Sequence, residues 1–257
     1  MKTFTLAVAG KGGTGKTTSC GLLIDWLARN GRGPILAVDA DANSNLNEVL
    51  GVEVETTLGE IREQVASAEL AAENPIPPGM SKQDYMDYRF ANALVEEDDY
   101  DLLVMGRTQG KGCYCFVNGL LQTEISRLVG NYRYMVVDNE AGLEHVSRGI
   151  LPSVDVLLLV SDCSRRGIQA VARIAELARE LRVGERTVLI VNRAPGGELN
   201  EGLKEEIEKN GLTLVGVVPQ DEMIYEYDCA GRPTSRLPEG SPARQALDRI
   251  AERIFNN

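Results

Sequence analysis

The sequence of 257 residues has little positive charge. It holds 27 Lys and Arg residues against 38 Asp and Glu residues, which gives a formal net charge of −11. A protein that binds nucleic acid non-specifically needs a cationic surface to displace counterions from the phosphates. The acidic balance therefore argues against nucleic acid as a partner.

Long hydrophobic runs are also missing. No apolar stretch approaches the roughly 20 residues that a membrane-spanning helix requires, although 43% of the residues are hydrophobic and can form a large core. Residues 1–4 lead into a strand-like run without the cleavage site of a signal peptide. The stretch 243–257 mixes acidic and basic residues, whereas a membrane-surface helix has a basic amphipathic face. We therefore expect a cytoplasmic protein without membrane attachment.

Cysteine and histidine are scarce. Five cysteines are an odd number and too few for a disulfide scaffold of this length, which fits a reducing cytoplasm. The single histidine, His145, has no second histidine with which to form a metal site, so we expect it to have a structural role.

Short apolar runs recur along the chain, and each is continuous rather than alternating. They are Phe4–Ala9, Ile35–Val38, Leu102–Met105, Tyr134–Val137, Val156–Val160, Val188–Val191 and Leu214–Val218. Continuous runs are typical of strands buried on both faces of a parallel sheet. Helical periodicity lies between several of them, and one such stretch places Cys20 on an apolar face, where it is expected to pack in the core. The pattern predicts an α/β fold: a doubly wound, mostly parallel, seven-stranded sheet with helices on both faces.

A single domain over residues 1–257 is expected. The interval 52–100 is less regular, because Asn74-Pro75 and Pro77-Pro78-Gly79 interrupt it. We interpret this interval as a helical and loop insertion that decorates the sheet.

Residues 10–17, with the sequence GKGGTGKT, satisfy the G-x-x-x-x-G-K-[ST] pattern of a phosphate-binding loop. The segment follows the first predicted strand and opens the first predicted helix, which is the context that the pattern requires. Glycines let consecutive backbone N–H groups face the phosphates, and the helix N-terminus adds partial positive charge. Lys16 can reach the β- and γ-phosphate oxygens of ATP, and the Thr17 hydroxyl can ligate Mg²⁺. The residues expected to contact the nucleotide here are Gly12, Gly13, Thr14, Gly15, Lys16, Thr17 and Thr18.

A second lysine, Lys11, precedes these glycines. With it the loop resembles the deviant Walker A motif of the MinD/ParA/nitrogenase-iron-protein class of P-loop ATPases. In that class the first lysine crosses a dimer interface to the nucleotide of the partner. The resemblance therefore implies a homodimer closed around two ATP molecules, with Lys11 and Lys16 both catalytic. The alternative is that Lys11 is a solvated loop charge.

The resemblance to this class extends to about residue 235. Asp39 and Asp41 end the second predicted strand, where the class has its first switch, and Ala42 replaces the usual proline. The resemblance gives Asp41 the role of orienting the attacking water. Asp138 matches the Walker B carboxylate, so Thr17, Asp39 and Asp138 are the expected magnesium residues.

Further nucleotide contacts are implied by the same resemblance. Gly142, in a second switch, is placed to sense the γ-phosphate. Asn192 and Arg193 match the segment that recognises adenine, and Pro219, Gln220 and Asp221 match the loop that packs on the base.

Cys113 and Cys115, in the loop 110–116, are the feature that distinguishes functions within this class. Cysteines at i and i+2 form a disulfide with each other poorly, because so short a ring strains the dihedral geometry. As thiolates, favoured by the nearby Lys111, they could share one soft metal ion. A twofold dimer supplies four sulfurs, which suits tetrahedral zinc or square-planar nickel. The alternative is two half-exposed cysteines in a flexible loop.

The second lysine, the Cys-x-Cys pair and the segment 142–149 together resemble the CooC-type nickel-inserting ATPases. The resemblance implies that Cys113 and Cys115 of two subunits hold Ni²⁺ or Zn²⁺ at the dimer interface. It also implies a nickel-containing client enzyme, either carbon monoxide dehydrogenase or acetyl-CoA synthase. Two alternatives remain: a MinD/ParA-like ATP-dependent localisation switch, and an iron–sulfur cluster carrier ATPase, whose cysteines are spaced differently.

Overall fold

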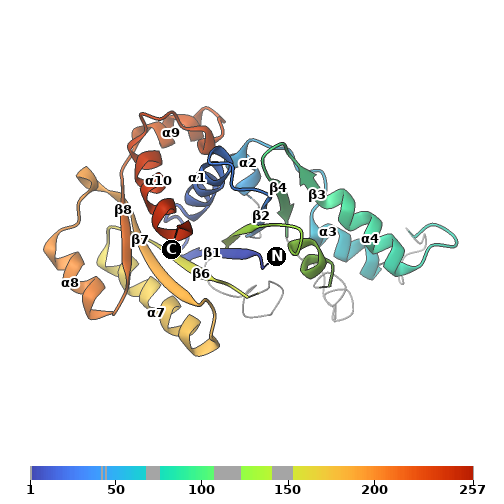
Figure 1. The fold of residues 1–257 in the computed structure, drawn as a ribbon, viewed down its shortest axis with the longest axis horizontal. Coiled ribbons are helices and arrows are strands. Elements are labelled where there is room, and N and C mark those ends of the chain that lie inside the picture. The colour runs from blue at the N-terminus through green and yellow to red at the C-terminus, as the bar shows by residue number, and fades with distance from the viewer. Residues whose placement is uncertain are drawn as a thin grey trace.

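A twisted sheet forms the centre of the protein (Figure 1). The computed structural model describes residues 2–41, 43, 45–67, 76–106, 123–140 and 153–256. Its eight strands lie in the order β3-β4-β2-β5-β1-β6-β7-β8. Their bounds are β1 Phe4–Gly10, β2 Ile35–Ala40, β3 Leu94–Glu96, β4 Asp101–Val104, β5 Tyr134–Asn139, β6 Val156–Asp162, β7 Arg186–Ala194 and β8 Leu214–Pro219.

The doubly wound, mostly parallel architecture predicted from the sequence is confirmed. All seven predicted strands are present and pair in parallel. The strand count is corrected by an eighth, β3, which pairs antiparallel with β4 at the sheet edge. Its three residues are too few to show a continuous apolar run, and they follow a helix without a turn signal.

Helices cover both faces of the sheet (Figure 1). They are α1 Lys16–Arg29, α2 Leu46–Leu50, α3 Leu58–Ser67, α4 Lys82–Ala93, a helix over 123–129, α7 Arg165–Leu181, α8 Glu201–Lys209, α9 Glu222–Cys229 and α10 Pro242–Phe255. Short 3-10 turns lie at Pro195–Gly197 and Thr234–Arg236. Among the described helices, none is both long and apolar enough to cross a membrane.

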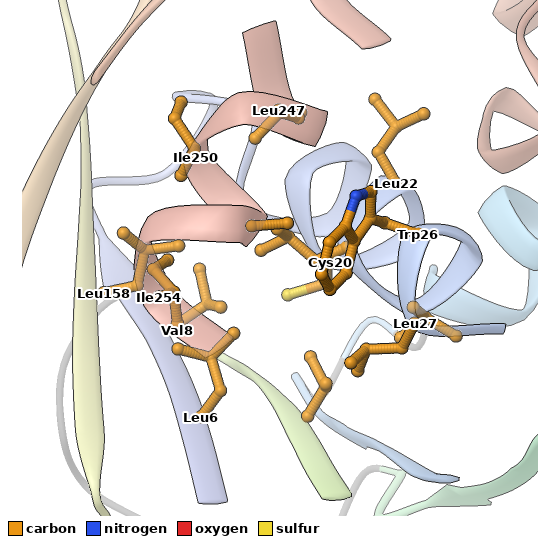
Figure 2. Close-up of a cluster of buried hydrophobic side chains, with 14 of the residues drawn as sticks. Leu6, Val8, Cys20, Leu22, Trp26, Leu27, Leu158, Leu247, Ile250 and Ile254 are labelled. Atoms are coloured by element: carbon orange, nitrogen blue, oxygen red, sulfur yellow. The ribbon is translucent and has the colours of Figure 1, made fainter. Parts of the chain in front are cut away.

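The core divides into layers because successive strand residues point to opposite faces of the sheet. Leu6 and Val8 of β1 face α1 and α10, where Figure 2 shows Cys20 and Ile254 in the same cluster. Cys20 is fully buried, as predicted. Alternate residues of β1, β6 and β7 pack against α7 and α8 on the other face. On that same face, α3, α4 and the 123–129 helix pack over β2, β4 and β5.

The interval 52–100 contains α3, α4 and β3. Ser81 caps α4 by accepting from the Asp84 backbone N–H, while the Asp84 carboxylate accepts from the Ser81 N–H. Ile61 of α3 and Met86 of α4 are fully buried in the cluster that covers this end of the sheet. The organisation of residues 1–257 as one domain stays a prediction.

Parallel pairing places the carboxyl ends of the strands at one edge of the sheet. The register pairs Asp39 of β2 with Asp138 of β5, and Asp162 of β6 with Asn192 of β7. Residues far apart in the sequence therefore meet beside the loop that joins β1 to α1. In doubly wound folds, ligands bind at this edge.

Candidate nucleotide-binding site

The loop between β1 and α1 is a tight turn shaped by close contacts. A Cβ at Gly10 would lie 2.2 Å from the Val160 carbonyl oxygen, so only glycine fits at the end of β1. The Thr14 hydroxyl donates to the Lys11 carbonyl oxygen at 2.8 Å and closes the loop. Gly15 has φ 89°, a left-handed conformation that glycine adopts without strain, and α1 begins at the next residue.

The start of α1 is suited to an anion. Its first turn contains no acidic residue, and no side chain caps it. The free N–H groups and the helix dipole thus favour negative charge at this point. Lys16 is only 7% exposed and lies within the site, whereas Lys11 is exposed on the loop.

Asp39 is fully buried at the end of β2. Its carboxylate accepts from the Asp41 N–H at 3.0 Å and from the Leu46 N–H at 2.9 Å. Burial raises the pKa of Asp39 to about 7, helped by the charge of Asp138 and opposed by the two backbone N–H donors.

Asp138 is 1% exposed, and neither of its carboxylate oxygens has a hydrogen-bond partner of conventional geometry among the described residues. Burial raises the pKa of Asp138 to about 6, although the nearby Thr17 hydroxyl and Lys16 ammonium act to lower it. A buried carboxylate without a partner is costly. Mg²⁺ prefers hard oxygen ligands, so the buried Asp138 carboxylate, with Thr17 and Asp39 beside it, fits this ion.

Asp41 lies at the same edge, directly after β2. Its backbone N–H is held by Asp39, and its own carboxylate accepts from the Asn43 N–H at 2.9 Å. This arrangement fixes the start of the loop that follows β2. The assignment of Asp41 to the attacking water stays a prediction.

Of the predicted adenine residues, Asn192 contacts the phosphate loop. Asn192 is 6% exposed, and its Nδ2 donates to the Thr14 carbonyl oxygen at 2.8 Å. Pro219 of β8 pairs with Ala194, and the Gln220 N–H donates to the Ala194 carbonyl oxygen at 3.0 Å. The ends of β7 and β8 are therefore adjacent, as a base pocket next to the phosphates requires.

Asp221 has a structural role that the sequence did not reveal. Its carboxylate accepts from the Met223 N–H at the start of α9, at 3.0 Å. It also accepts from the Ser241 hydroxyl at 2.6 Å and the Ala243 N–H at 3.1 Å, at the start of α10. The carboxylate thus ties two helix N-termini together, and its predicted contact with the base stays a prediction.

Two residues beside Asp138 gained no role at this site from the sequence: Asn139 was not singled out, and Cys20 was expected only to pack in the core. Asn139 is buried, donates to the Val8 carbonyl oxygen at 3.1 Å, and has an Oδ1 without a partner among the described residues. Burial, and secondarily the charge of Asp138, raise the pKa of the Cys20 thiol, so it is not a reactive thiolate. The available signals were a polar residue directly after the Walker B carboxylate and a cysteine one turn after Lys16.

The predicted metal loop 110–116 with Cys113 and Cys115, together with Gly142 and His145, lies outside the described residues. Within the described ranges, no group of three or more His, Cys, Asp or Glu side chains is arranged to hold a metal ion. Cys163 is partly exposed and Cys229 exposed.

Comparisons with known proteins agree with this geometry. The CobQ/CobB/MinD/ParA nucleotide binding domain (CbiA) matches residues 5–234. An uncharacterised ATP-binding protein of Methanocaldococcus jannaschii is 44% identical over 251 residues, 98% of each chain. The carbon monoxide dehydrogenase accessory protein CooC of Rhodospirillum rubrum is 30% identical over 242 residues, 88% of this chain and 87% of that one.

Among solved structures, the cell division ATPase MinD of Pyrococcus furiosus matches with a TM-score of 0.71 over 99% of both chains, at 22% identity. This likeness shows that the fold is shared. Taken with the phosphate loop at the head of α1, these similarities establish that the chain belongs to the CobQ/CobB/MinD/ParA family of nucleotide-binding proteins and is a P-loop ATPase.

Proposed function

We propose that the protein is an ATP-hydrolysing metallochaperone. It dimerises with ATP and one nickel or zinc ion and supports nickel insertion into carbon monoxide dehydrogenase or acetyl-CoA synthase. The observation that carries this proposal is the Cys113-x-Cys115 pair in a chain that is similar to CooC over 88% of its length.

The ATPase part of the proposal uses the site at the edge of the sheet. Lys16 and the N–H groups at the start of α1 neutralise the phosphates, and Asp41 orients the attacking water. Thr17, Asp39 and Asp138 would hold Mg²⁺, which would supply positive charge at the phosphates. Gly142 contacts the γ-phosphate in the ATP state.

Dimerisation in this proposal depends on the exposed Lys11. Its side chain is exposed, in contrast to the buried Lys16, so it is accessible to a partner subunit. Reaching the partner's nucleotide would make the interface depend on ATP. The same twofold dimer brings the two Cys113 and Cys115 pairs together, and Ni²⁺ is then cargo of the assembly rather than a resident cofactor.

Nickel titration of the purified protein, with mass followed by light scattering, tests the proposal. We expect one Ni²⁺ or Zn²⁺ per two chains in the wild type, and loss of this binding in Cys113→Ala and in Cys115→Ala. Cys229→Ala is the matched control, because Cys229 is an exposed cysteine on a different element. One tightly bound metal per monomer, or full binding by Cys113→Ala, would contradict the shared site.

A MinD/ParA-like localisation switch is the second candidate. The septum site-determining protein MinD of Synechocystis is 26% identical over 259 residues, which favours it. Such a switch would dimerise with ATP whether or not nickel is present. An iron–sulfur carrier, the third possibility, would instead show stoichiometric iron and visible absorption after anaerobic purification.

A further inference from the structure

Asn192, predicted to contact the base, is already bonded to the phosphate loop. Its Nδ2 donates to the Thr14 carbonyl oxygen at 2.8 Å, across 178 positions of sequence. The approach is tight, since a Cβ added at Gly15 would lie 2.3 Å from the same Nδ2 atom. Asn192 therefore sits directly against the turn that presents N–H groups to the phosphates.

The position of Asn192 is itself fixed by its surroundings. Its Oδ1 accepts from the Arg193 N–H at 2.9 Å. Its backbone lies in the ladder between β6 and β7, opposite Asp162. A side-chain amide has two N–H donors and two acceptor lone pairs, so one donor and one lone pair remain for a base.

The Thr14 carbonyl depends on this bond. Thr14 is 2% exposed, so little water reaches the residue. A buried acceptor that loses its donor retains the full cost of its desolvation. Without Asn192, the turn at residues 13–15 would tend to rearrange until that carbonyl finds another donor.

We propose that Asn192 is a positioning residue for the phosphate loop, in addition to any contact with adenine. It holds the Thr14 carbonyl and so presets the turn at residues 13–15 before a base is bound. This inference rests on the ATP-binding part of the proposed function and not on nickel. Its consequence is that Asn192 affects the binding of phosphates that carry no base.

Inorganic tripolyphosphate with Mg²⁺ separates these two roles, because it has neither base nor ribose. Calorimetric titration of the full chain compares the wild type with Asn192→Ala and Asn192→Asp. Asn192→Asp keeps the shape of the side chain and an acceptor for the Arg193 N–H, but it cannot donate to Thr14. We expect both variants to bind tripolyphosphate about tenfold more weakly than the wild type. Their affinity for ATP should fall by at least the same factor.

Asn210→Ala is the matched control. The Asn210 Nδ2 donates to the Glu206 carbonyl oxygen at 2.7 Å, at the C-terminal end of α8. This variant loses a comparable amide-to-carbonyl bond away from the site, and its tripolyphosphate affinity should equal that of the wild type. The backbone amide NMR chemical shifts of Gly13, Gly15 and Lys16 should differ from the wild type in ligand-free Asn192→Asp. The same shifts should be unchanged in ligand-free Asn210→Ala.

Several results would overturn the proposal. One is an Asn192→Ala protein that binds tripolyphosphate like the wild type and loses only ATP affinity, which would mean that Asn192 acts through the base alone. Others are equal weakening in Asn210→Ala, and a wild type that binds no tripolyphosphate. If Asn192→Ala fails to fold, Asn192→Val decides the question, because it also lacks a donor for Thr14 and, unlike Asn192→Asp, adds no negative charge beside the phosphates. Failure of the nickel proposal appears separately, as metal binding that is independent of Cys113, and leaves these affinities unchanged.

Discussion

Asp39 on β2 and Asp138 on β5 lie directly opposite each other in the parallel ladder, and both carboxyl groups are buried. Their environments differ: Asp39 accepts two backbone N–H groups, whereas Asp138 has no hydrogen-bond partner of conventional geometry among the described residues. Two adjacent buried carboxylates repel each other when both are ionised. A divalent cation held by these carboxylates would relieve this repulsion, so folding stability would depend on magnesium as well as on pH.

The first prediction concerns pH. Burial raises the pKa of Asp39 to about 7 and that of Asp138 to about 6, whereas an unfolded Asp titrates near pKa ~3.9. Between about pH 4 and about pH 7 the folded chain therefore binds more protons than the unfolded chain. Its free energy of unfolding falls as the pH rises through this range. We expect the thermal midpoint of the Mg²⁺-free protein to be higher at pH 5 than at pH 8 for this reason. Adding Mg²⁺ and ATP should flatten that slope, and a slope that Mg²⁺ leaves unchanged would argue against the site.

The second prediction is a trade between stability and activity at Asp138. Asp138→Asn removes a buried charge that is disfavoured by burial, as its raised pKa of about 6 indicates, so it should stabilise the Mg²⁺-free protein at pH 8 by on the order of 1 kcal/mol. The same change should abolish Mg²⁺-dependent ATP hydrolysis, because it removes a carboxylate that is expected to hold Mg²⁺. Chemical unfolding and phosphate release measure the two effects. Asp155→Asn is the control, since Asp155 precedes β6 at the opposite end of the strands, where it pairs with Lys2 and accepts from the Thr5 backbone N–H.

The third prediction separates phosphate binding from water orientation. Lys16→Ala should abolish turnover and weaken nucleotide binding, because the buried ammonium lies within the phosphate loop. Asp41→Asn should keep ATP affinity and lose hydrolysis, since it removes only the group assigned to the water. Equilibrium binding of ATP and single-turnover phosphate release distinguish the two. An Asp41→Asn protein that hydrolyses ATP at the wild-type rate would show that the first-switch assignment is wrong.

The fourth prediction concerns the base. The bonds to Thr14 and Arg193 leave Asn192 one N–H donor and one lone pair on Oδ1. The donor complements N7 of adenine, and the lone pair complements its N6 amino group. Guanine presents two acceptors at these positions, so the amide oxygen would face guanine O6 unfavourably. ATP should therefore be turned over in preference to GTP by a factor of roughly 10 or more. Comparable kcat/KM values for the two nucleotides would remove the basis for this assignment.

Local patterns in the sequence explain which parts of this fold and site could be predicted. The phosphate loop is contiguous, and the buried parallel strands are continuous apolar runs, so both are visible in the sequence. The edge strand β3 has only three residues and no such signal. The contact between Asn192 and Thr14 joins positions 178 apart, and the bond from Ser241 to Asp221 depends on how two helices meet. Such contacts follow from strand order and helix packing, which a single sequence does not specify.

The last prediction couples nickel to ATP. If Cys113 and Cys115 of two subunits share one ion, the metal and ATP both bind the dimer in preference to the monomer. Each ligand must then favour the other, because linkage between equilibrium affinities is reciprocal. We expect ATP to tighten nickel binding in a variant that binds but does not hydrolyse ATP, such as Asp41→Asn, and nickel to tighten ATP binding by the same factor. Cys113→Ala should still hydrolyse ATP, because residue 113 lies outside the phosphate loop. It should lose this coupling, because it lacks a proposed metal ligand. Paired titrations of each ligand at saturating and zero concentrations of the other measure the two factors. Absence of coupling in Asp41→Asn, or coupling that persists in Cys113→Ala, would rule out the shared interface as its source.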